Sequence, residues 1–230
     1  MQQIFVNKNS VDPPPITVKK KKNNVDRAAL YSALENNHLE TAKRLIENAL
    51  RLLNTEDSKG NTALHLASAT GSCDIIKQII DANEGEMKTY RFVNKQNHSG
   101  STSLHVALQN NHLEIAQQLI DYGAKPNTED NKGNTALHLA SSLGNLELVK
   151  HIIKQNRKNM KTSQFINERN GAGCAAIHIA LENNQLALTE QLMSYRARLD
   201  LGNGQGNTAL HLAAITGNSN LIKNMIGHCR

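Results

Sequence analysis

The residues Thr62-Ala63-Leu64-His65-Leu66-Ala67 recur unchanged at 135–140 and 208–213, and in altered form at 102–107 and 175–180. A further, degenerate copy precedes them all. Self-similarity at a regular spacing is the sequence signature of a repeat protein. The sequence therefore predicts a series of similar small units stacked in chain order, and not one globular core.

The spacing of the copies reveals a larger duplication. Measured on the His of each copy, with Tyr31 standing in for His in the degenerate first copy, the separations are 34, 40, 33, 40 and 33 residues. His65, His138 and His211 lie 73 residues apart, so a two-unit block has been duplicated. We expect six units, at about 26–56, 57–96, 97–129, 130–169, 170–202 and 203–230.

Each unit reads as two short helices joined by a turn. The first stretch places Leu and Ala on one helical face, and a second apolar run, such as 146–153, repeats the pattern. Such a pair cannot bury its apolar face alone, so neighbours must share one elongated core. Residues that tolerate a left-handed helix cap separate the two helices. These are Gly71, Gly144, Gly217 and the Asn-Asn pairs at 36–37, 110–111 and 183–184.

The repeated motif carries a family resemblance. Gly-x-Thr-x-Leu-His-x-Ala is complete at 60–67, 100–107, 133–140 and 206–213, and the 33-residue period appears twice. Over residues 26–230 the chain resembles the ankyrin-repeat family. The resemblance implies an all-α solenoid of stacked helix-turn-helix units, with β-turn loops projecting as fingers.

The chain departs from the family pattern at two positions of the motif. The usual Pro after Thr is replaced in all five copies from unit 2 onward, which should weaken each unit only modestly, because Pro preorganises a helix start without donating a bond. Thr itself is replaced by Ala175, so we expect the unit centred on His178 to be softer than its neighbours. The residues at the Pro position are Ala63, Ser103, Ala136, Ala176 and Ala209.

The recurring His has two interpretations. A catalytic or metal-binding series would need acids or thiols converging on it, whereas stacking places successive imidazoles about 10 Å apart on separate units. The family resemblance assigns the His to structure, where it hydrogen-bonds backbone of the adjacent loop and helps Thr to cap the helix. We favour the structural role, and no metal or cofactor is predicted.

Two 40-residue units owe their length to related insertions at 81–92 and 154–165, which share Met87 and Phe92 with Met160 and Phe165. One interpretation lengthens the second helix by about two turns, with Met and Phe sealing its underside. The alternative makes the insertions a second contact surface.

The N-terminal segment differs in composition from the repeats. Residues 1–27 hold six Lys or Arg and two Asp, a net charge of +4 out of +6 for the chain. Pro13-Pro14-Pro15 and the run Lys19 to Lys22 predict a disordered tail over 1–25. The lysines are a solvated run, a nuclear import signal or a contact for phosphate or anionic lipid.

Composition points to a reducing compartment. Three widely spaced cysteines form neither a disulfide framework nor a zinc motif, and we see no membrane span or secretory signal. We expect a cytoplasmic protein. The 29 Asn and 17 Lys resemble the bias of AT-rich genomes, and ankyrin proteins of such intracellular bacteria are often delivered into a host cell. That resemblance implies a host protein as partner, in host cytosol or nucleus.

In the family the partner lies against the concave face, built from loop tips and the exposed side of each first helix. Aligned on the His, this face is neutral and rich in Asn, which suits hydrogen bonding to a protein and lacks the Arg and aromatic density typical of nucleic-acid binding. The predicted partner-binding residues are Ser58, Lys59, Asn61, Thr70, His98, Ser101, Gln109, Asn110, Asn131, Lys132, Asn134, Ser142, Leu143, Glu182 and Asn183.

Catalysis finds no support in the sequence, which lacks a phosphate-binding Gly-rich loop, a nucleophile elbow and His-Glu-x-x-His. Three hypotheses follow. The first is a non-catalytic scaffold that binds another protein through the groove. The second is the recognition domain of a larger enzyme or secreted effector, since 220–226 lacks the charged outer face of a capping repeat. The third and weakest is a nucleic-acid binder acting through the basic tail.

Overall fold

The computed structural model describes residues 15–48, 52–83, 86–156 and 161–228. These residues form 14 helices and no β-strand, which confirms the predicted all-α fold. The first helices of the units are α1, α3, α6, α8, α11 and α13; the second helices are α2, α4, α7, α9, α12 and α14. The bounds are α1 Pro15–Glu35, α2 Leu39–Asn48, α3 Ala63–Thr70, α4 Cys73–Ala82, α5 Glu86–Val93, α6 Ser103–Gln109, α7 Leu113–Asp121, α8 Ala136–Leu143, α9 Leu146–Asn156, α10 Thr162–Ile166, α11 Ala176–Glu182, α12 Leu186–Ser194, α13 Ala209–Thr216 and α14 Ser219–His228.

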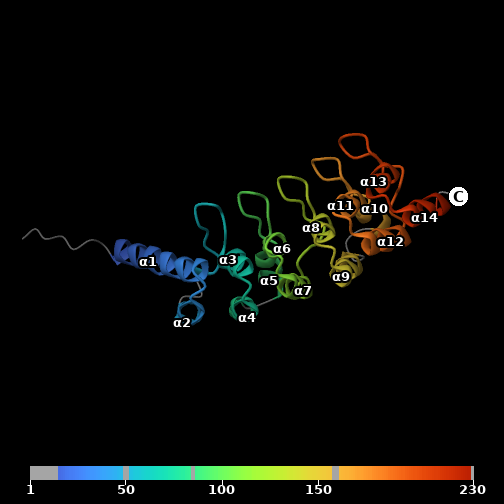
Figure 1. The fold of residues 1–230 in the computed structure, drawn as a ribbon. Helices are drawn as coiled ribbons and strands as arrows, with labels where there is room; N and C mark the ends of the chain where they lie inside the picture. The colour runs from blue at the N-terminus through green and yellow to red at the C-terminus, as the bar shows by residue number, and fades with distance from the viewer. Residues whose placement is uncertain (1–14, 49–51, 84–85, 157–160, 229–230) are drawn as a thin grey trace, which may run out of the picture.

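The units stack in chain order from α1 to α14 (Figure 1). First helices pack on first helices, as α3 does on α6 and α6 on α8, and second helices pack on second helices, as α2 does on α4. A long loop rises on one side of the stack ahead of each first helix from α3 onward (Figure 1). We call these loops the fingers of units 2 to 6, at 56–61, 96–101, 129–134, 169–174 and 202–207.

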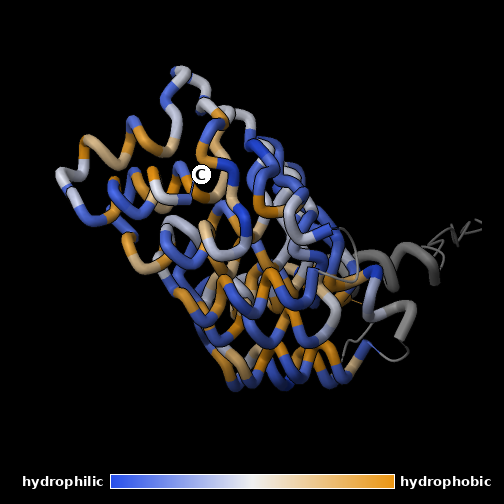
Figure 2. The backbone as a smooth tube through the Cα atoms, turned by 90° about the vertical axis from the view of Figure 1, so that its right-hand side faces the viewer, coloured by the Kyte–Doolittle hydropathy of each residue, from blue (hydrophilic) through white to orange (hydrophobic). Residues whose placement is uncertain are grey.

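One elongated core runs through the stack. Apolar positions recur along the helices, whereas the fingers are mainly hydrophilic (Figure 2). The motif leucines Leu64, Leu104 and Leu137 are fully buried, because the next unit covers each of them. Leu210 of the last unit is 40% exposed. Burial of these side chains, each stabilising by about 1.5–3 kcal/mol, therefore depends on the neighbouring unit.

The predicted left-handed helix caps are confirmed. Gly71, Gly144 and Gly217 end α3, α8 and α13 with φ between 67° and 80°. The second Asn of each Asn-Asn pair also adopts positive φ, just beyond the ends of α1, α6 and α11. The values are φ 56° at Asn37, 59° at Asn111 and 54° at Asn184.

The prediction of a disordered tail is wrong from residue 15 onward. Residues 15–25 belong to α1, in which Pro15 is the first residue, a position where Pro needs no N–H partner. The part of α1 that packs on α2 and α3 removes the nucleation cost, and lysines are good enough helix formers for the helix to extend back from it. Residues 1–14 lie outside the described chain.

The insertions do not lengthen the second helices. α4 ends at Ala82 and α9 at Asn156, and the separate short helices α5 and α10 follow. The helix break brings the chain back toward the stack, so that Phe92 and Phe165 are buried. The predicted burial of these two phenylalanines is therefore confirmed. The side chains of Met87 and Met160 lie outside the described residues.

Candidate protein-binding groove

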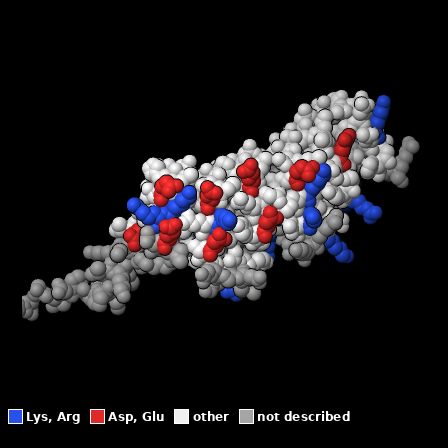
Figure 3. Space-filling view, turned by 90° about the horizontal axis from the view of Figure 1, so that it is seen from below, with Lys and Arg blue, Asp and Glu red and all other residues white. Residues whose placement is uncertain are grey.

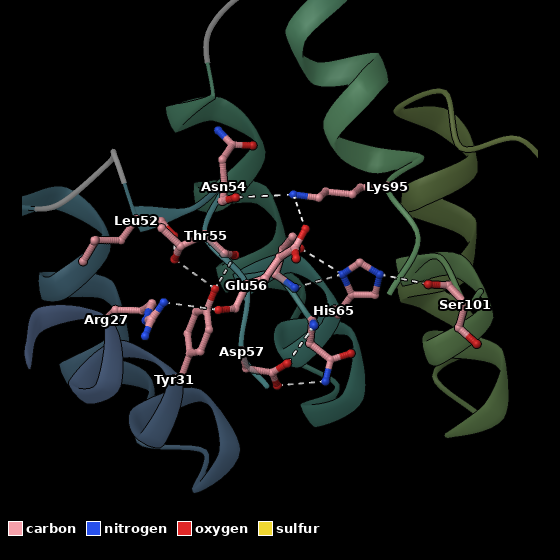
Figure 4. Close-up of polar contacts among 12 residues, drawn as sticks. Arg27, Tyr31, Leu52, Asn54, Thr55, Glu56, Asp57, His65, Lys95 and Ser101 are labelled. Carbon is pink, nitrogen blue, oxygen red and sulfur yellow. Dashed lines mark hydrogen bonds and ion pairs between the residues drawn. The ribbon is translucent and has the colours of Figure 1, made fainter. Parts of the chain in front are cut away.

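The repeated His holds the fingers in place. The Thr62 N–H donates to His65 Nδ1 at 3.2 Å, so the ring proton is on Nε2, which donates to the Ser101 carbonyl at 3.0 Å (Figure 4). His105 contacts the Asn134 carbonyl in the same way, and His138 that of Cys174. Burial lowers the pKa of all three imidazoles, which favours the neutral, structural form. The predicted structural role of the His matches these contacts.

Tyr31 takes over this role in the first unit. Its hydroxyl donates to the Thr55 carbonyl, as the His rings do to the carbonyls of their neighbours (Figure 4). Burial is the main cause that raises the pKa of this phenol. The degenerate copy therefore keeps the link between units with a different side chain.

Each finger is a tight turn closed by its own Asp or Asn. In the finger of unit 2, the Asp57 carboxylate accepts from the N–H groups of Lys59 and Asn61 at 2.7 and 2.8 Å. Gly60 has φ 76°, and a Cβ there would lie 2.9 Å from the His98 nitrogen, so the neighbouring finger leaves no room for a side chain. Asn97, Asp130, Asn170 and Asn203 close the other fingers in the same way.

The fingers are also joined tip to tip by backbone hydrogen bonds. The His98 N–H donates to the Lys59 carbonyl at 3.0 Å, and the Asn131 N–H to the Ser99 carbonyl at 3.0 Å. The Gly171 N–H continues the series to the Lys132 carbonyl at 2.8 Å. These surface loops thus form one continuous, preorganised wall along the stack.

A hollow of about 570 Å³ lies between this wall and the first helices of units 3 and 4. It brings together residues from two fingers, 96–101 and 129–134, and from α6 and α8. Six of the predicted binding residues line it: His98, Ser101, Gln109, Asn131, Lys132 and Asn134. Asn97, Ser99, Asp130 and Leu139 complete the lining.

The other predicted residues lie elsewhere on the finger side. Ser58, Lys59 and Asn61 are on the finger of unit 2, which donates no residue to this hollow. Glu182 lines a second hollow of about 390 Å³ with Leu181, Leu212 and Ile215, between α11 and α13. Thr70, Asn110, Ser142 and Asn183 sit at first-helix ends, where each side chain hydrogen-bonds a carbonyl of its own helix. Leu143 is half-buried beside them.

Leu139 is the lining residue that sequence reasoning missed. It follows the buried His138 and is half-buried itself, with its side chain in the hollow. The variable position x of the Leu-His-x-Ala motif could have revealed it, because this residue directly follows the buried His along the helix and so lies at the edge of the buried face. Leu139 gives an otherwise polar hollow an apolar floor.

Other kinds of site find little support. Within the described ranges, no three His, Cys, Asp or Glu side chains are placed to hold a metal ion. Burial raises the pKa of the Cys73 and Cys174 thiols, which disfavours a reactive thiolate. None of the helices in the described part is long and apolar enough to cross a membrane. The face below the fingers mixes acidic and basic side chains (Figure 3).

Helix pairs stacked in one row, with linked fingers and a groove beside them, define a repeat protein of the protein-interaction class. Three copies of the family model for ankyrin repeats match the sequence, over residues 6–89, 85–164 and 162–229. The chain belongs to the ankyrin-repeat family, whose repeats are protein-interaction modules.

One solved structure similar to this chain comes from the complex of the Bd0816 predatory endopeptidase of Bdellovibrio bacteriovorus with immunity protein Bd3460. The matched chain is 26% identical, with a TM-score of 0.71, and the match covers 86% of this chain and 97% of that chain. A search of curated proteins found no match.

Proposed function

We propose that the chain is a non-catalytic scaffold that binds a partner protein in the hollow between units 3 and 4. The observation that carries the proposal is the convergence of six predicted binding residues on one hollow of about 570 Å³. A concave site with a few convergent polar groups over an apolar floor is typical of a binding site.

The free side chains of this hollow indicate how a partner would be held. The side chains of His98, Gln109 and Lys132 are exposed and make no hydrogen bond within the described residues, so their polar atoms face solvent. Leu139 supplies apolar contact beneath them. Such a lining suits an extended segment that offers polar groups along its edge and one apolar side chain toward the floor.

The rigidity of the wall supports the same proposal. Side-chain closure within each finger and backbone hydrogen bonds between fingers order the loops before binding. Because the loops are already ordered in the free protein, binding a partner loses less conformational entropy, which favours affinity. The similar solved structure comes from a complex of two proteins, which agrees with a binding role.

We place this activity in a reducing compartment such as the cytoplasm, because Cys73 and Cys174 are free thiols. Delivery into a host cell, with a host protein as partner, is the effector form of the same proposal. The two forms of the proposal are distinguished by the lysate, bacterial or eukaryotic, from which a partner is captured.

The test compares retention of proteins from lysate by three immobilised forms of the chain. The groove variant carries Gln109→Arg and Lys132→Glu. The control variant carries Thr41→Arg and Lys77→Glu, which produce the same net charge on exposed positions of second helices. Lysates of the source organism and of eukaryotic cells are both used, after circular dichroism has shown equal helix content.

We expect at least one protein to be retained by the original chain and the control variant, with more than tenfold less on the groove variant. Isothermal titration of the purified partner would then show the same order. Equal retention by all three forms would refute the groove as the binding site. Loss of the retained protein on the control variant alone would assign the binding site to the second helices.

A further inference from the structure

The hollow of units 5 and 6, between the first helices α11 and α13, is related by 73 residues to the hollow of units 3 and 4. Gln109 and Leu139 line the hollow of units 3 and 4, and the equivalent residues Glu182 and Leu212 line that of units 5 and 6. The hollow of units 5 and 6 has a volume of about 390 Å³, and its lining comes from α11, the turn after it and α13. The same row of first-helix positions therefore lines both hollows, so the second one continues the proposed groove.

An exposed isoleucine distinguishes the hollow of units 5 and 6. Ile215 is 79% exposed, the largest exposed fraction of any large apolar side chain in the described part of the chain. The equivalent residues at the earlier spacings of 73 are small, Ser142 and Ala69. Ile215 shares the hollow with the buried side chains of Leu181 and Leu212. These aliphatic side chains form an apolar patch, and covering such a patch with another aliphatic side chain is favourable.

A carboxylate lines the same hollow as this apolar patch. Glu182 is exposed, and its Oε1 accepts from the Asn203 amide at 3.3 Å, which links the carboxylate to the finger of unit 6. Among the described residues Glu182 forms no ion pair, so Oε2 can accept from an incoming cation. Gln109 is uncharged at the equivalent position, so the exposed acid belongs to the hollow of units 5 and 6.

The hollow of units 3 and 4 presents the opposite charge. Lys132 contributes an exposed ammonium there, and Gln205 replaces it 73 residues later. Asp130 also lines that hollow, but it is only 8% exposed, and its carboxylate accepts from N–H groups of its own finger. A segment lying along the groove therefore meets an exposed cation at units 3 and 4, and an apolar patch with an exposed carboxylate at units 5 and 6.

The spacing of the two hollows suits one extended segment. Neighbouring helices pack about 8–10 Å apart, so hollows two units apart are separated by roughly 20 Å. An extended chain covers about 3.3 Å per residue, so about six residues bridge that distance. Alternate side chains of an extended segment face the same way, so two neighbouring contacts within one hollow come from residues i and i+2.

We propose that the hollow of units 5 and 6 binds an aliphatic side chain and a basic side chain two residues apart in an extended segment of the partner protein. The aliphatic side chain packs on Ile215 and Leu212, and the basic side chain pairs with Glu182 Oε2. Arginine is the best fit, because its guanidinium can donate to a carboxylate and to a neighbouring acceptor together. This inference rests on the proposed function, since the same segment continues to the hollow of units 3 and 4.

The test uses the full chain with ¹³C-labelled Ile and Leu methyl groups, and short capped peptides as probes. The first probe is acetyl-Ala-Leu-Ala-Arg-Ala-amide, and two matched probes replace its Arg by Glu or its Leu by Ser. We expect the Ile215 methyl signal, assigned by its absence in Ile215→Ser, to shift saturably with a dissociation constant of about 1–10 mM. The Glu probe should bind about fivefold more weakly and the Ser probe about tenfold more weakly.

Two double variants localise the binding, with the Leu212 methyl signals as the reporter. Glu182→Gln with Ile215→Ser introduces the residues found in the hollow of units 3 and 4, and should weaken binding of the first probe by about tenfold or more. Glu190→Gln with Ile226→Ser removes the same charge and another exposed isoleucine from the second helices α12 and α14. This control variant should bind the first probe as the original chain does.

Several results would overturn the inference. They are no shift at about 10 mM of the first probe, equal binding of the Arg and Glu probes, and equal weakening in both double variants. An Ile215 signal that moves with chain concentration alone would assign the hollow to a second copy of the chain. The peptides test the hollow of units 5 and 6 alone, whereas the lysate capture varies Gln109 and Lys132. Failure of this inference is therefore distinguishable from failure of the proposed function.

Discussion

Restoring the missing threonine of unit 5 should stabilise the protein. In the other complete units, Thr Oγ1 lies 2.7–2.9 Å from Nδ1 of the motif His. Ala175 has no hydroxyl, and only its N–H reaches His178 Nδ1, at 3.0 Å. Its backbone angles, φ −85° and ψ 166°, match those of Thr62 and Thr102. A threonine can therefore take the same position without backbone strain.

Ala175→Thr adds one buried hydrogen bond and a helix N-cap. Each kind of contribution is worth about 1 kcal/mol, and because they share one hydroxyl we expect a total near 1 kcal/mol. Space is available, since Thr62 and Thr135 are fully buried at the equivalent position. For a chain of this length the melting temperature should rise by about 2–4 °C.

Urea and thermal unfolding of the original chain, Ala175→Thr and Ala175→Val provide the measurement. Valine has the shape of threonine without the hydroxyl, so it fills the same volume but adds no hydrogen bond to His178 Nδ1. We expect a gain for threonine and none for valine. An equal gain for both would refute the hydrogen-bond argument and assign the effect to packing.

Three further perturbations have expected outcomes. Phe165→Ala should cost about 3–5 kcal/mol in urea unfolding, because the ring is fully buried where α10 returns to the stack. Acidification should destabilise the fold through the buried imidazoles of His65, His105 and His138. Burial lowers their pKa values below 6.5, so the stability that they contribute above pH 6.5 is lost as the pH falls. The urea unfolding midpoint, measured as the pH is lowered from 6.5, would detect this loss. Burial and the Glu129 charge raise the pKa of Glu168 from 4.5 to about 6, so its contribution to stability is greatest below pH 4.5 and is lost as pH rises through 6. The unfolding free energy of Glu168→Gln relative to the original chain should therefore increase with pH over this window.

Local rules explain why much of the fold could be predicted from the sequence. Gly144 and Asn111 differ chemically, yet both tolerate positive φ, so the turn between helices was predictable at either residue. The 73-residue spacing of the His likewise predicted the stacking, because every unit needs the next one to cover its leucine.

The parts that could not be predicted depend on tertiary packing. Nothing local distinguishes a lengthened α9 from a helix that ends at Asn156, and the break is decided by whether Phe165 can return to the core. Residues 15–25 look disordered by composition, but the docked part of α1 supplies the nucleus they extend from. The hollow needed the register of two fingers against α6 and α8, so Leu139 was missed.

The two 73-residue blocks show where this chain has freedom to change. Core and finger-linking positions are the same in both blocks, as Leu64 and His65 match Leu137 and His138. Positions on the finger side differ, since His98 and Gln109 of the first block become Gly171 and Glu182 in the second. A partner held by one block would therefore meet different chemistry on the next, which fixes the register of binding along a stack of nearly identical backbones. The replacement of Lys95 by Glu168 follows neither pattern, because it removes the partly exposed Lys95–Glu56 ion pair from the second block. A duplicated scaffold tolerates such a change because an ion pair between partly exposed side chains contributes at most about 1 kcal/mol to stability.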